Sequence, residues 1–157
     1  MSERDHDFMR EALELAARAG ALGEVPVGAV AVADGRIVGR GFNRRETQRD
    51  PLAHAELVAL GEAARALGAW RLSGVTIFAT LEPCAMCAGA MVQARVARLV
   101  FGARDPKAGA AGSLYNLLED PRHNHRVPVT EGVLGEDCGR ILTEFFRRLR
   151  EQQRTTE

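Results

Sequence analysis

The sequence has no long apolar run, and its first residues do not look like a targeting segment. No apolar stretch among its 157 residues is long enough to span a membrane. Residues 1–7 are polar and of mixed charge, which argues against a signal peptide or a transit peptide. We therefore expect a protein that stays in the cytoplasm and does not insert into a membrane.

Cysteine is scarce. The three cysteines are too few, and odd in number, for a disulfide framework. Cys84 and Cys87 form a C-x-x-C motif, which in a reducing compartment indicates metal binding or redox chemistry. Cys138 lies outside this motif, and we expect it to be a small buried helix residue.

Net charge is also absent, since 21 basic residues balance 21 acidic ones. Bulk charge therefore gives no support for a nucleic-acid partner. The arginines nevertheless gather in three stretches, 36–49, 122–126 and 147–154. This distribution is compatible with a folded RNA contacted over a limited patch, and almost equally with ordinary solvated faces.

The chain contains no repeat, no low-complexity segment and no linker, so we expect a single domain over residues 1–157, with 152–157 as a frayed tail. Hydrophobic spacing predicts helices over 8–19, from 50–51 to beyond 64, 84–94, 113–120 and 136–150. Strands are predicted over 27–32, 37–42, 75–80, 97–102 and 127–130. The strand–helix–strand order over 75–102 indicates parallel pairing. The expected fold is a three-layer α/β/α arrangement, with a central mixed five-stranded sheet covered by helices on both faces.

A candidate metal site joins the two motif cysteines to His54, which lies about thirty residues before them. Alone, Cys84 and Cys87 could be a redox pair or half of a structural zinc site. With His54 they form three ligands and leave a fourth position open, which is typical of catalytic zinc. We expect His54 and Cys84 to begin two helices, where unpaired N–H groups favour a thiolate.

Glu56 is a candidate general base for a zinc-activated water at the open position. It would take a proton from this water and pass it to the leaving group. Residues two apart diverge by roughly 200° around a regular helix. His54 and Glu56 can therefore share a site only at the end of their helix.

The pattern H-x-E followed by P-C-x-x-C is the signature of zinc deaminases. Here it is formed by residues 54–56 and 83–87. A thioredoxin-like redox pair is disfavoured because Pro83 precedes Cys84 and no tryptophan does. The carboxylate of Glu56 is expected to move protons and not to ligate the metal.

Similarity to a known family extends beyond this signature. It is carried by residues 24–30, 54–56, 81–90, 101–105, 109–114 and 124–127. On these stretches the chain resembles the bacterial tRNA-specific adenosine deaminases of the cytidine deaminase-like superfamily. The signature is shared across the superfamily, whereas the last three stretches are specific to the tRNA adenosine branch.

The resemblance implies hydrolytic deamination of the wobble adenosine to inosine in the anticodon loop of an arginine tRNA. It also implies a homodimer with one Zn²⁺ per subunit, held by His54, Cys84 and Cys87, with Glu56 as the catalytic proton carrier.

Further roles follow from the resemblance for residues outside the metal site. Asn43 should contact the purine ring, Val27 should line its pocket, and Ala55 should offer its backbone N–H to the base edge. The residues expected to contact flanking nucleotides or the anticodon loop are Asp105, Lys107, Asn124 and Phe145.

Two other functions remain open from the sequence. A free-base or nucleoside deaminase, acting on guanine or cytosine, would share the zinc site but need no basic rim. A non-catalytic RNA-binding subunit could carry a structural zinc, although such a subunit has no need of Glu56.

Overall fold

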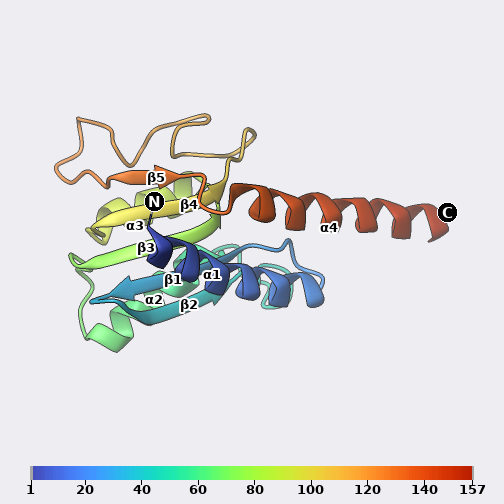
Figure 1. Ribbon diagram of the computed structural model, residues 1–157, viewed down its shortest axis with the longest axis horizontal. Coiled ribbons are helices and arrows are strands. Elements are labelled where there is room, and N and C mark those ends of the chain that lie inside the picture. The colour runs from blue at the N-terminus through green and yellow to red at the C-terminus, as the bar shows by residue number, and fades with distance from the viewer. Residues whose placement is uncertain (1, 157) are drawn as a thin grey trace.

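A mixed five-stranded sheet with the strand order β2-β1-β3-β4-β5 forms the centre of the computed structural model, which describes residues 2–156 (Figure 1). The elements are α1 (Glu3–Ala21), β1 (Gly28–Ala33), β2 (Arg36–Phe42), α2 (Ala55–Leu67), β3 (Val75–Leu81), α3 (Ala85–Gln93), β4 (Arg98–Ala103), β5 (Val129–Glu131) and α4 (Gly135–Thr156). Among residues 2–156, no helix combines the length and hydropathy of a membrane span.

The strand pairing explains where the chemistry can gather. β1 is antiparallel to both β2 and β3, whereas β3 is parallel to β4, and β4 to β5. The predicted parallel unit β3-α3-β4 and the predicted mixed sheet are thus confirmed. In a parallel unit the helix begins beside the carboxyl end of the strand before it. The start of α3 therefore lies at the end of β3, beside the start of α2.

Helices cover both faces of the sheet, as the sequence predicts. Side chains alternate along each strand. Ala31, Ile77 and Leu99 pack with α2 and α3, while Val30 and Val100 face the other way, toward α1 and the start of α4. The result is the expected three-layer α/β/α fold.

Helix α2 approaches the sheet closely because β2 has glycine at the contact. A Cβ atom at Gly41 would overlap the carbonyl oxygen of Ala55 and lie 2.8 Å from the backbone nitrogen of Ala59. The absence of that atom allows the first turn of α2 to rest on the strand. This contact fixes the height of residues 54–56 above the sheet.

Two predicted helix starts lie elsewhere in the structure. The helix expected from 50–51 begins at Ala55, because Asp50 caps a turn in which its Oδ1 accepts from the Leu52 N–H at 2.9 Å. The first helix begins at Glu3, five residues before its expected start. A capping box between Ser2 and Asp5 supplies the additional turn.

The predicted helix over 113–120 is wrong. This segment forms turns and an isolated antiparallel bridge between Ala111 and Asn116. The N–H and hydroxyl of Ser113, expected to cap a helix, both donate to Glu82. Those donors are therefore committed to a tertiary partner, and Ser113 does not cap a helix.

The last helix is longer than predicted. α4 continues through Thr156, so residues 152–156 are helical and do not form the frayed tail that the sequence suggested; residue 157 lies outside the described residues. Its start packs against the sheet through the buried Cys138, whereas its far end projects beyond the other elements (Figure 1).

Candidate active site

A pocket of about 210 Å³ opens where α2 and α3 begin. His54 is the N-cap residue of α2, and Cys84 is the N-cap residue of α3. Neither side chain makes the capping hydrogen bond that this position usually provides. Both are therefore directed to each other across the gap between the helices.

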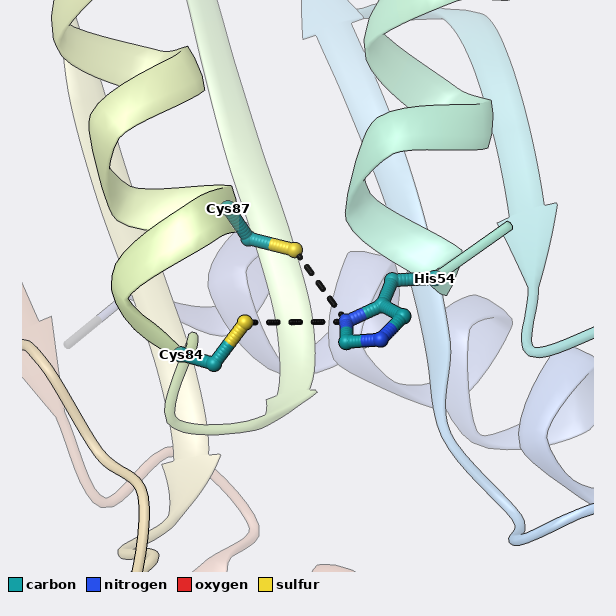
Figure 2. Close-up of side chains that lie close together, drawn as sticks. All are labelled: His54, Cys84 and Cys87. Carbon is teal, nitrogen blue, oxygen red and sulfur yellow. Dashed lines mark hydrogen bonds between the residues drawn. The ribbon is translucent and has the colours of Figure 1, made fainter. Parts of the chain in front are cut away.

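The three predicted metal ligands converge on one point (Figure 2). The Nδ1 atom of His54 lies 3.6 Å from Sγ of Cys84 and 3.5 Å from Sγ of Cys87. A tetrahedral ion with usual zinc–sulfur and zinc–nitrogen bonds separates such atoms by about 3.6 Å. The three side chains therefore form a site that could hold a metal ion of this geometry.

Electrostatics favour ionisation of one of the two thiols. Hydrogen bonds from Cys87 and His54 lower the pKa of Cys84 to about 3. The hydrogen bond to Cys84 in turn raises the pKa of His54. The pKa of Cys87 is raised, because its proton is held by Cys84 and because the side chain is buried. These shifts favour ionisation of Cys84, and binding of a metal through both sulfur atoms would require deprotonation of Cys87 as well.

Glu56 lies in the second position of α2 and lines the same pocket. Glu56 is buried, with only 4% of its surface exposed. Burial raises the pKa of its carboxyl to about 7, and the neighbouring Cys84 charge acts in the same direction. A carboxyl group with this pKa can both accept and donate a proton near neutral pH.

Four of the residues expected to contact substrate line this pocket: Val27, Asn43, Ala55 and Asp105. The Asn43 amide is already held in place. Its Nδ2 donates to the Val25 carbonyl at 3.2 Å, and its Oδ1 accepts from the Arg45 N–H at 3.2 Å. The orientation of this side chain is therefore set before any ligand arrives.

The other three expected contacts lie outside the pocket lining. Lys107 is exposed on the loop that follows Asp105. Asn124 lines a separate hollow with Ser73 and Arg95, which lie at the opposite ends of β3 and α3 from the pocket. Phe145 lines a third hollow, between α1 and α4.

Sequence reasoning missed two buried carboxylates beside the pocket, Glu24 and Glu82, which are 1% and 2% exposed. Glu24 accepts hydrogen bonds from the backbone N–H groups of Glu46 and Thr47 and from the Thr47 hydroxyl. It thereby holds the loop that carries Asn43 and the pocket-lining Arg45. Burial by itself would raise the pKa of Glu24, but these hydrogen bonds outweigh it, and the pKa is lowered. The only local signal was an acidic residue next to an apolar strand.

Comparison with known proteins agrees with this site. The MafB19-like deaminase family matches residues 3–150. A curated relative from Bacillus subtilis, the tRNA-specific adenosine deaminase, is 51% identical over 151 residues, which cover 96% of this chain and 94% of the relative.

Two solved structures share the fold. One, from a study of A-to-I editing by tRNA:A34 deaminases at the wobble position of transfer RNA, superposes with a TM-score of 0.83 at 43% identity, covering 87% of this chain and 99% of that one. A second, a guanine deaminase from Nitrosomonas europaea, gives a TM-score of 0.77 at 27% identity, covering 89% of this chain and 83% of that one.

The family match spans most of the chain, and the curated relative is similar over nearly its full length. The pocket further combines a His/Cys/Cys set with a buried glutamate. This chain therefore belongs to the MafB19-like deaminase family and to the tRNA-specific adenosine deaminases.

Proposed function

We propose that the protein removes the amino group of the wobble adenosine of a tRNA anticodon by hydrolysis, which yields inosine and ammonia. The observation that carries the proposal is the presence of Glu56 in the same pocket as the His54, Cys84 and Cys87 side chains. The substrate follows from the family to which the chain belongs.

In this proposal, one Zn²⁺ per subunit is held by His54, Cys84 and Cys87. Two thiolates and an imidazole are soft or borderline ligands, which favour zinc over harder cations. Zinc, when bound, supplies a Lewis acid that lowers the pKa of water toward neutrality. The lowered pKa of Cys84 assists loading because this thiol ionises easily.

Glu56 carries the protons. It accepts one proton from the attacking water as the new C–O bond forms at C6 of the purine, and it delivers that proton to N1 as the C6=N1 double bond becomes single. It then moves the remaining hydroxyl proton to the exocyclic nitrogen, so that the C–N bond breaks, C6=O forms and the nitrogen leaves as ammonia. Burial raises the pKa of this carboxyl, which makes its protonated form accessible for the proton-donating steps.

The base is held by groups that are present at the pocket before binding. Val27 provides an apolar wall, and the fixed Asn43 amide provides polar contact with the purine ring. Ala55 is the first residue of α2, so its backbone N–H has no partner within the helix and can donate to the base edge. A pocket of this kind accepts an unstacked base, which a tRNA loop provides at low energetic cost.

Contacts with the flanking nucleotides are proposed for Asp105 in the pocket lining, for Lys107 on the loop that follows it and for Asn124 at a distance. Contact with the anticodon loop is proposed for Phe145, which is also at a distance from the pocket. Since these last two line other hollows, one RNA can reach all four only by extending beyond the pocket or by touching a second subunit. We accordingly propose that the protein acts as a homodimer. From the family resemblance we also propose that its substrate is an arginine tRNA and that it acts in the cytoplasm.

The test is an inosine assay on an anticodon stem-loop with adenosine at the wobble position, using the zinc-loaded protein. Matched substrates carry the adenosine one position away, or are free guanine, cytosine and adenosine. We expect inosine at the wobble position only. Turnover of a free base without inosine in the RNA would instead support the guanine or cytosine deaminase alternative, for which the Nitrosomonas europaea structure is the precedent.

A further inference from the structure

One wall of the pocket is a loop that has little structure of its own. This rim loop, residues 104–113, contributes Asp105 and Ala108 to the pocket lining. Apart from the bridge at Ala111, it contains no helix or strand in the described chain. Its turns are held partly by its own hydrogen bonds, such as those from the Lys107 and Ala108 N–H groups to the Asp105 carboxylate, and partly by groups outside it.

Among the groups outside the loop, Glu82 accepts four hydrogen bonds from it. Its Oε1 accepts from the Asp105 N–H at 3.0 Å and from the Ser113 hydroxyl. Its Oε2 accepts from the N–H groups of Ala111 and Ser113, both at 3.0 Å. One carboxylate at the end of β3 thus binds both ends of the rim loop.

The loop is also shaped to receive this carboxylate. Gly109 packs directly on it, and a Cβ atom at that position would overlap the Glu82 carboxyl group. The backbone of Gly109 also donates to the Asp105 carbonyl at 2.9 Å, and the next residue donates to the Pro83 carbonyl at 2.8 Å. The close packing of Gly109 on the carboxylate is an observation separate from the four hydrogen bonds. Both observations place the Glu82 carboxylate at the centre of the loop.

We propose that Glu82 is a positioning residue that holds the rim loop in its substrate-binding shape before the RNA arrives. The inference rests on the proposed function. Without the carboxylate, the loop would be ordered only when RNA binds, and the entropic cost of that ordering would weaken binding. The catalytic side chains stand on α2 and α3, so saturating RNA should restore the rate.

The first experiment compares Glu82→Gln with the unaltered protein in steady-state deamination of the anticodon stem-loop. Glutamine is nearly the same size, but its amide nitrogen would face N–H donors and cannot accept from them. We expect KM to rise about 10- to 100-fold and kcat to stay within about threefold, with zinc content unchanged. Partial unfolding would instead lower kcat at constant KM. The proposal is overturned by any of three results: a lower kcat at constant KM, an unchanged KM, or the loss of zinc.

A double-mutant cycle tests the contact itself. Gly109→Ala should raise KM about tenfold, because the new methyl group displaces the carboxylate. In a Glu82→Ala background the same substitution should have little effect, because the obstructed group is gone. Gly139→Ala is the matched control, since a Cβ atom there meets nothing within 4 Å. Additive effects of the two substitutions would contradict the proposed contact.

Amide hydrogen exchange provides a readout that needs no activity. The N–H groups of Asp105, Ala111 and Ser113 donate to Glu82. They should exchange at least about tenfold faster in Glu82→Gln, while α3 keeps its protection. Unchanged exchange rates would overturn the positioning role of Glu82, whether or not the protein is active on RNA. Faster exchange in a protein that is inactive on RNA would overturn only the proposed function.

Discussion

The partly buried ion pair between Asp5 and Arg98 joins the start of α1 to β4, and its loss should lower the free energy of unfolding measurably. Arg98 donates to the two carboxylate oxygens of Asp5 at 3.1 and 2.9 Å, and it also donates to the Thr130 hydroxyl. The side chains are 33% and 9% exposed for Arg98 and Asp5. Removing one partner of a fully buried pair costs about 3–5 kcal/mol. Because water reaches part of Arg98, we expect about 2–3 kcal/mol for Asp5→Asn, or about 5–10 °C in Tm.

Urea unfolding of the chelator-treated protein at pH 7 measures this difference. Asp7→Asn is the matched control, since its pair with Arg10 is exposed by 70% and 60% at the two side chains. The control should cost less than about 0.5 kcal/mol. If Asp5→Asn costs no more than the control, the pair between Asp5 and Arg98 does not stabilise the fold.

The pH dependence of the Asp5 pair has a defined sign. Its hydrogen bond to Arg98 lowers the pKa of Asp5 in the folded protein. The stabilisation is therefore present above the unfolded pKa of about 3.9 and is lost as pH falls toward the folded pKa. The free-energy gap between the unaltered protein and Asp5→Asn should narrow by about 0.5–1 kcal/mol between pH 7 and pH 3.5. A gap that stays constant would refute the electrostatic reasoning.

Four further substitutions test the site and its support. Glu56→Gln should lower kcat for inosine formation at least about 10³-fold while elemental analysis finds zinc unchanged, and substantial activity would exclude it as the proton carrier. Cys87→Ala should lose the metal, so full zinc occupancy would contradict its role as a ligand. Glu24→Gln should raise KM for the stem-loop about tenfold and speed amide exchange at Thr47; slow exchange there would show that the loop needs no carboxylate. Gly41→Ala should cost about 1–3 kcal/mol in urea unfolding, whereas a neutral variant would mean that α2 can shift away from β2.

The sheet could be predicted from the sequence because its signals are local. Buried apolar runs mark β3 and β4, and the helix between them supplies the crossover connection that a parallel pair of strands requires. The convergence of His54 with Cys84 and Cys87 was predictable for a similar reason, since each motif lies at a helix start and its spacing restricts the ligand geometry.

What could not be predicted depends on partners far away in the chain. Ser113 has the local features of a helix cap, but it donates to Glu82, which is 31 residues earlier. Glu82 itself appears in the sequence only as an acid before a proline. The position of Asn124, at the far end of β3 from the pocket, follows from the strand order and not from any motif around it.

The two ends of α4 are packed differently, so they should differ in how readily they unfold locally. At its start Cys138 is buried, whereas residues 146–155 are exposed. Because these turns bury little of their surface, their stability depends mainly on the helix itself, which is only marginally stable in water at this length. The outer turns should therefore unfold and refold locally, many times for each global unfolding event, while the inner turns open only with the sheet. A protease should accordingly remove the outer turns first and leave a trimmed chain that still contains the whole sheet and both helices of the pocket.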